Sequence, residues 1–188
     1  MQSVISQMLL ARHKLRKVDE LKYIVIHRTL GETVEESLAE FRKTEKFDAG
    51  WYTGGLYPYH FFVDPVRVVT QCLPISRIGP AALRTLNETG IHVAAAGDFR
   101  KRPPTPAQEA ALTALVASLS TCYNDALDII GHTERADLAA LKNSKDPSKV
   151  CPGKFLDIVK LRMAVYGDPS NLCELAPSDG LRRAGIVV

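Results

Sequence analysis

The feature that most constrains the fold of this chain is an uninterrupted apolar run, Tyr23 to Ile26, that ends at His27. A strand with one face in water alternates apolar and polar side chains, whereas a run without polar positions is typical of a strand buried on both faces. We therefore expect this segment to lie inside a sheet that other elements cover on both sides.

Further strand-like segments alternate with helical ones along the chain. The strands are expected at residues 59–63, 66–71, 91–96 and 128–130. The helices are expected at residues 33–46, 81–86, 106–123 and 155–165. This alternation predicts an α/β fold with a mixed central β-sheet flanked by helices. We divide the chain into an N-terminal arm or helix at 1–21, one domain at 22–167 and a C-terminal tail at 168–188.

Local signals place the core-facing sides of these helices. Thr33 is the expected N-cap of the first helix, and Thr105 precedes a proline at the start of the third. The third helix carries its apolar stripe at Ala111, Leu112, Leu115 and Leu119. In the last helix, the residues expected to face the core are Leu156, Val159 and Met163.

The composition is that of an ordinary globular protein. Of the 188 residues, 46% are hydrophobic and 24% are charged, which suits one compact domain with short extensions. The net charge of +3 favours approach to an anionic polymer such as a cell wall, but it does not by itself indicate nucleic acid. We interpret the basic runs at 12–17 and 100–102 as solvated surface. No apolar stretch is long enough to span a membrane.

Two histidines follow strands in the same manner. His27 comes directly after Ile26, and His132 follows the strand at 128–130 through a glycine. Strand ends in α/β folds project side chains into a shared crevice. Cys151 lies further along the loop after His132. Two histidines and one cysteine suit a catalytic zinc site, which has three protein ligands and an open position for water whose pKa the metal lowers toward neutrality.

These motifs occur in an order that resembles a known family. The matching segments are Tyr23–His27, Tyr59–Val63, Gly90–Phe99, Thr105–Gln108, Ile129–His132 and Lys149–Pro152. Together they resemble the zinc amidase family that includes phage N-acetylmuramoyl-L-alanine amidases and the animal peptidoglycan recognition proteins. The resemblance covers roughly residues 22–165 and implies a single zinc amidase domain of the amidase/peptidoglycan recognition protein fold.

The resemblance also implies a metal and its ligands. It assigns Zn²⁺ to His27, His132 and Cys151. Some members of the family use aspartate as the third ligand, and here Asp146 precedes a proline as Cys151 does. We favour Cys151, because a lysine stands two residues before it, as in the family motif, and because a thiolate is the softer zinc ligand.

Two catalytic residues are implied beside the metal, Tyr59 and Lys149. A lysine ammonium can stabilise the oxyanion of amide cleavage, and a tyrosine hydroxyl can orient the attacking water. Neighbouring residues of a strand face opposite ways, so we expect Tyr59 to face the site and His60 to be structural. His13 and His92 are interpreted as ordinary residues of a surface helix and a strand.

The implied function is hydrolysis of the amide bond between N-acetylmuramic acid and L-alanine in peptidoglycan, in a phage-type, bacteriolytic endolysin. The alternatives are a cytoplasmic amidase that recycles muropeptide fragments, a non-catalytic peptidoglycan-binding module, and a zinc protein with a regulatory or virion-structural role. The expected partner is peptidoglycan or a muropeptide, without nucleic acid or membrane, and the protein is expected to be a monomer. The N-terminus lacks the order of a secretory signal, so we expect synthesis in the cytoplasm and action on the cell wall after release.

Overall fold

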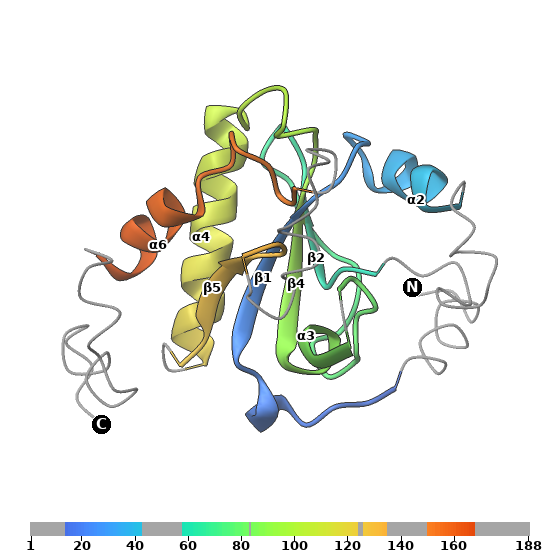
Figure 1. Cartoon of the computed structure of the whole chain (residues 1–188), viewed down its shortest axis with the longest axis vertical. Coiled ribbons are helices and arrows are strands. Elements are labelled where there is room, and N and C mark those ends of the chain that lie inside the picture. The colour runs from blue at the N-terminus through green and yellow to red at the C-terminus, as the bar shows by residue number, and fades with distance from the viewer. Residues whose placement is uncertain (1–13, 43–57, 83, 124–125, 135–149, 168–188) are drawn as a thin grey trace.

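The structure is a computed structural model, and it describes residues 14–42, 58–82, 84–123, 126–134 and 150–167. Within these ranges the strands form one five-stranded sheet of order β3-β2-β4-β1-β5 (Figure 1). They are β1 (Tyr23–Arg28), β2 (Phe61–Val63), β3 (Val69–Gln71), β4 (Gly90–Ala95) and β5 (Asp128–Gly131). The β2–β3 pair is antiparallel and the other pairs are parallel. The predicted mixed central sheet is therefore confirmed.

Strand β1 is an interior strand of this sheet. It pairs in parallel with β4 on one side and with β5 on the other, so that Ile24 lies level with both Ile91 and Ile129. The side chains of Ile24, Val25 and Ile26 are completely buried. A strand with neighbours on both edges and covered faces needs apolar side chains at every position, which explains the uninterrupted apolar run.

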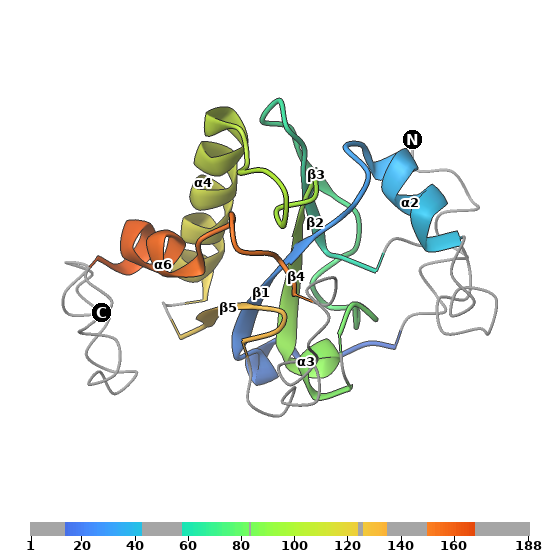
Figure 2. The ribbon, with the colours of Figure 1, turned by 45° about the horizontal axis from the view of Figure 1, so that its top comes forward.

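Helices α4 (Pro106–Cys122) and α6 (Ile158–Tyr166) lie on one face of the sheet (Figures 1 and 2). Their buried side chains share a core with Ile24 and Ile26 of β1. The predicted stripe of α4 is confirmed, with Leu115 partly buried and Ala111, Leu112 and Leu119 buried. The Thr105 side chain accepts a hydrogen bond from the backbone N–H of Gln108, as expected of an N-cap. None of the described helices is long and apolar enough to cross a membrane.

The stripe expected for α6 is partly wrong. Val159 and Met163 are 49% and 50% exposed, whereas Ile158 and Leu161 are buried beside Leu156. The helix has apolar residues on both sides, so spacing alone does not select the inner one. Contacts distant in the sequence select it instead: the Tyr166 hydroxyl donates to the Leu127 carbonyl, and Arg162 donates to that of Ile129.

The opposite face of the sheet carries α2 (Val34–Arg42) and α3 (Arg84–Thr89) (Figure 2). Leu86 of α3 packs on Val25, and Val34 of α2 packs against the cluster that contains Tyr59 and Phe62. Three buried histidines lie among these residues, namely His27, His60 and His92. This face therefore combines apolar packing with a set of imidazole rings.

The segment before β1 is an extended arm that ends in a short 3-10 helix, η1 (Val18–Glu20). Residues 14–17 are not helical, and Leu15 forms an antiparallel bridge with Arg77. The Arg16 guanidinium donates to the carbonyls of Ile75 and Gly90 at 2.7 and 2.6 Å. Burial lowers the pKa of Arg16 to about 10. Interpreting this basic run as solvated was therefore wrong for Arg16, because its side chain caps backbone carbonyls in the fold.

We predict that Arg16→Met destabilises the protein by about 1–3 kcal/mol, because two partly buried carbonyls lose a charged donor. Lys17→Met is the matched control, since within the described residues the Lys17 side chain forms an exposed pair with Glu20 at 3.7 Å, and such pairs contribute about 0–1 kcal/mol. The free energy of unfolding in urea at neutral pH measures both changes. Equal losses in the two variants would contradict this role of Arg16.

Candidate metal centre

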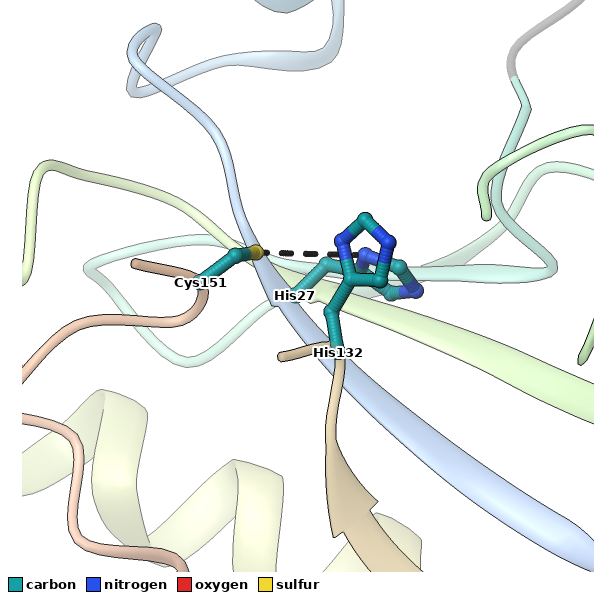
Figure 3. A group of neighbouring side chains, drawn as sticks. All are labelled: His27, His132 and Cys151. Atoms are coloured by element: carbon teal, nitrogen blue, oxygen red, sulfur yellow. Dashed lines mark hydrogen bonds between the residues drawn. The ribbon is translucent and has the colours of Figure 1, made fainter. Parts of the chain in front are cut away.

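Three side chains from distant parts of the sequence meet at one end of the sheet: His27 at the end of β1, His132 just after β5, and Cys151 before α6 (Figure 3). One ligand atom from each lies within 4.8 Å of the others. Nδ1 of His27 is 4.0 Å from Sγ of Cys151. The parallel pairing explains this, because Ile26 lies level with Gly131, so that the next residues, His27 and His132, reach the same edge of the sheet.

Backbone contacts hold the two later side chains in place. The N–H of His132 donates to the Ile26 carbonyl at 3.0 Å, so the β1–β5 ladder continues to the histidine. The hydroxyl of Thr133 donates to the Cys151 carbonyl at 2.9 Å and accepts from the Cys151 N–H at 3.3 Å. Thr133 thus fastens the Cys151 segment directly beside His132.

Burial sets the charge of these groups. The pKa of His27 lies well below its usual value, first because of burial and then because of neighbouring imidazoles. Burial lowers the pKa of His132 to about 4. Both rings are therefore neutral at neutral pH and keep a lone pair. Burial raises the pKa of the Cys151 thiol to about 11, although Arg28 and Arg100 act in the opposite direction. The thiol therefore keeps its proton at neutral pH beside these arginines, and a bound metal ion would be needed to form the thiolate.

The arrangement suits a zinc ion. Zinc binds histidine nitrogen at about 2.0 Å and cysteine sulfur at about 2.3 Å in tetrahedral geometry, which places such a nitrogen and sulfur roughly 3.5 Å apart. The 4.0 Å between His27 and Cys151 is close to that spacing. Two histidines and a cysteine are also a known donor set of catalytic zinc sites. The residues present thus fit the metal that the sequence motifs imply.

Tyr59 lies against this group. Its ring centroid is 4.9 Å from that of His27, and its side chain is 6% exposed. The neighbouring His60 points elsewhere: its Nδ1 accepts from the backbone N–H of His92, and its Nε2 lies 2.9 Å from the Arg77 carbonyl. Lys149, Asp146 and His13, which the sequence analysis also considered, lie outside the described residues.

His92 is a site residue that sequence reasoning missed. Its Nδ1 lies 3.0 Å from Nε2 of His27, the ring nitrogen opposite the one that faces Cys151. Only the register of β4 against β1 indicates that the two histidines are neighbours. Because His92 lies level with Val25, and Val25 and His27 point to the same face of β1, the two histidines become diagonal neighbours once β4 is paired with β1.

An acidic residue after β4 organises the basic groups near Cys151. Asp98 accepts from Arg100 at 2.6 Å and pairs with Arg28 at 3.4 Å. Arg28 also donates to the Val150 carbonyl. Hydrogen bonds from Arg100 lower the pKa of Asp98 to about 2, although burial opposes this shift. The basic run at 100–102 is therefore not simply solvated: Arg100 is bound by Asp98, and Arg102 pairs with Glu32.

The chain is similar to known cell-wall amidases. The model of a family described as N-acetylmuramoyl-L-alanine amidase matches residues 17–154. Among curated protein sequences, none matches the chain.

Solved structures of similar fold include the endolysin amidase LysCS from Clostridium intestinale, with 23% identity, a TM-score of 0.59, and coverage of 79% of this chain and 86% of that one. An endolysin of a Thermus scotoductus bacteriophage has 22% identity, a TM-score of 0.57, and coverage of 83% and 90%. A mutant of Drosophila PGRP-LB in complex with tracheal cytotoxin has 17% identity, a TM-score of 0.54, and coverage of 80% and 83%. At these identities the likeness shows the fold, and the expected amidase/peptidoglycan recognition protein-like fold is confirmed.

We predict that Asp98→Asn destabilises the protein in a pH-dependent way. The folded-state pKa of Asp98 is about 2, below its ordinary 3.8. The stabilisation is therefore complete above about pH 4 and is lost as pH falls toward 2. At neutral pH the loss is about 1–3 kcal/mol, as expected for charged hydrogen bonds. Urea unfolding across this pH range measures it, with the exposed Asp19→Asn as control. A difference between wild type and Asp98→Asn that stays constant down to about pH 2 would contradict this account.

Proposed function

The chain belongs to the N-acetylmuramoyl-L-alanine amidase family, and from this premise we propose that it hydrolyses the amide bond between N-acetylmuramic acid and L-alanine in peptidoglycan with the help of zinc. The observation that carries the proposal is the convergence of His27, His132 and Cys151, whose ligand atoms lie within 4.8 Å of one another. A recognition module that only binds the wall has no need of this complete donor set.

In this proposal the three side chains hold the metal through defined atoms. His27 binds through Nδ1, because this atom faces Cys151 while Nε2 contacts His92. His132 offers a neutral ring, and Cys151 offers its sulfur. When bound, zinc supplies Lewis-acid chemistry, since it activates water near neutral pH and polarises the carbonyl of the scissile amide. The buried neighbours of His27 keep bulk water away from the inner side of the ligands.

Two further residues are proposed to act on the reacting amide. The Tyr59 ring lies against His27, so its hydroxyl can orient the attacking water or donate to the oxygen on which negative charge develops. Lys149 stands two residues before Cys151 in the sequence, and its ammonium group is proposed to stabilise the same oxyanion. The amide nitrogen that leaves as an amine requires a proton, and the attacking water gives one up. The Tyr59 hydroxyl, which can accept one proton while it donates another, is proposed to pass it on, while Lys149 stays charged.

We propose that the biological role is that of a phage-type endolysin. The supporting observation is the likeness in fold to the endolysins of Clostridium intestinale and of a Thermus bacteriophage. Such an enzyme is made in the cytoplasm and acts as a monomer on the cell wall after release. An amidase that recycles soluble muropeptides would share the chemistry, so the rate on intact sacculi compared with that on soluble fragments separates the two roles.

The choice of third ligand is tested by paired variants. We predict that Cys151→Ala loses the bound zinc and at least about a thousandfold of amidase activity, because the metal supplies several kcal/mol of transition-state stabilisation. Asp146→Ala, the alternative ligand, should keep both. Zinc content and release of new amino termini from sacculi are measured on the same preparations. If Asp146→Ala is the inactive variant, the proposed ligand is wrong while the proposed reaction stands.

A further inference from the structure

The contact between His27 and His92 is buried on all sides. Nε2 of His27 and Nδ1 of His92 are 3.0 Å apart, and the two residues are 1% and 0% exposed. Water therefore cannot complete the hydrogen bonding of either nitrogen. A neutral imidazole carries one proton, on one of its two ring nitrogens. One of the two rings must then donate to the other.

Only one direction of this hydrogen bond leaves His27 ready for a metal. If His27 donates from Nε2, its Nδ1 carries a lone pair and faces Cys151 Sγ, 4.0 Å away. If His92 donates from Nδ1 instead, the proton of His27 must lie on Nδ1, which then cannot bind a metal. The tautomer of His92 thus determines whether the nitrogen nearest Cys151 is available.

The surroundings of His92 favour the first direction. Its Nε2 makes no hydrogen bond among the described residues, and the backbone carbonyl of Leu86 is an acceptor that lies near the ring. Both the carbonyl and the ring lie close to Gly90. A Cβ added there would be 2.6 Å from the Leu86 oxygen and 3.4 Å from Cε1 of His92. A carbonyl can only accept, and Nδ1 already faces His27, so a proton on Nε2 is the arrangement that offers this carbonyl a donor. Nδ1 is then left to accept the Nε2 proton of His27.

The ring of His92 is also fixed in orientation. It stacks on the ring of His60 with 5.6 Å between centroids and an angle of 16°. Nδ1 of His60 accepts from the backbone N–H of His92 at 2.9 Å. Gly79 leaves room for both rings, because a Cβ there would lie 3.0 Å from Cε1 of His60 and 3.2 Å from Cδ2 of His92. This packing restrains His92 from turning its other nitrogen toward His27.

From these contacts we infer that His92 is a positioning residue for the metal centre. It accepts the Nε2 proton of His27 and thereby keeps Nδ1 of His27 free and directed at the metal. The inference rests on the proposed zinc function, but it concerns a residue outside the ligand set. Partners of this kind on the far nitrogen of a ligating histidine contribute about 10–100-fold in metal affinity.

The test compares His92→Leu with His92→Asn in the full chain. Leucine removes the acceptor, and zinc affinity, measured by competition with a chromophoric chelator, should fall about 10–100-fold. Asparagine places its amide oxygen on Cγ, where histidine has Nδ1, and should restore most of that loss. Gln108→Met is the control for damage to the core, since Gln108 is fully buried and donates to the carbonyls of Val63 and Ala96. It should leave zinc affinity unchanged.

A second readout uses the metal-free wild type and requires no variant to fold. Nitrogen NMR of ¹⁵N-labelled histidine reports which ring nitrogen of His27 holds the proton, and Nε2 is expected. A proton on Nδ1, or equal zinc affinity in His92→Leu and wild type, would overturn the inference. So would an asparagine variant that binds zinc as weakly as the leucine variant. Wild type that binds no zinc at all would instead contradict the proposed function, so the two failures are distinguishable.

Discussion

The parallel pairing of β1 with β4 and β5 is the constraint on which the rest of the structure depends. It requires β1 to be apolar on both faces, and it brings the end of β1 and the residue after β5 to the same edge of the sheet. His27 and His132 meet for that reason. The same register places His92 beside His27 on the face that α2 and α3 share. A shift of one residue would turn His27 into the opposite core.

Burial then gives these histidines their chemical character. Neutral imidazoles retain a lone pair for a metal at a pH where exposed histidines are partly protonated. Burial has the opposite consequence for Cys151. It raises the pKa of the thiol and so disfavours the thiolate, which is the form that binds a metal. The arginines held by Asp98 and a bound cation would each favour the thiolate. A cation bound here would therefore complete the charge balance of the site.

The sheet, the α4 stripe and the proximity of His27, His132 and Cys151 could be predicted from the sequence, because they depend on local patterns and on where strands end. Features that depend on contacts between distant segments could not be predicted in this way. The role of His92 requires the strand register, the inner side of α6 is selected by bonds from Tyr166 and Arg162, and the burial of Arg16 requires carbonyls of two other segments. Lys149 stays a prediction, since it lies outside the described residues.

The most direct test of the zinc amidase account is product analysis on intact sacculi. Full-length protein is stripped of metal, divided, and assayed with and without added zinc, while new amino termini on L-alanine are counted. The account predicts about one bound zinc per chain and new termini only in the zinc-loaded sample. A protein that binds zinc and adheres to sacculi, but releases no L-alanine amino termini from them or from soluble muropeptides, would contradict it and would identify a binding module instead.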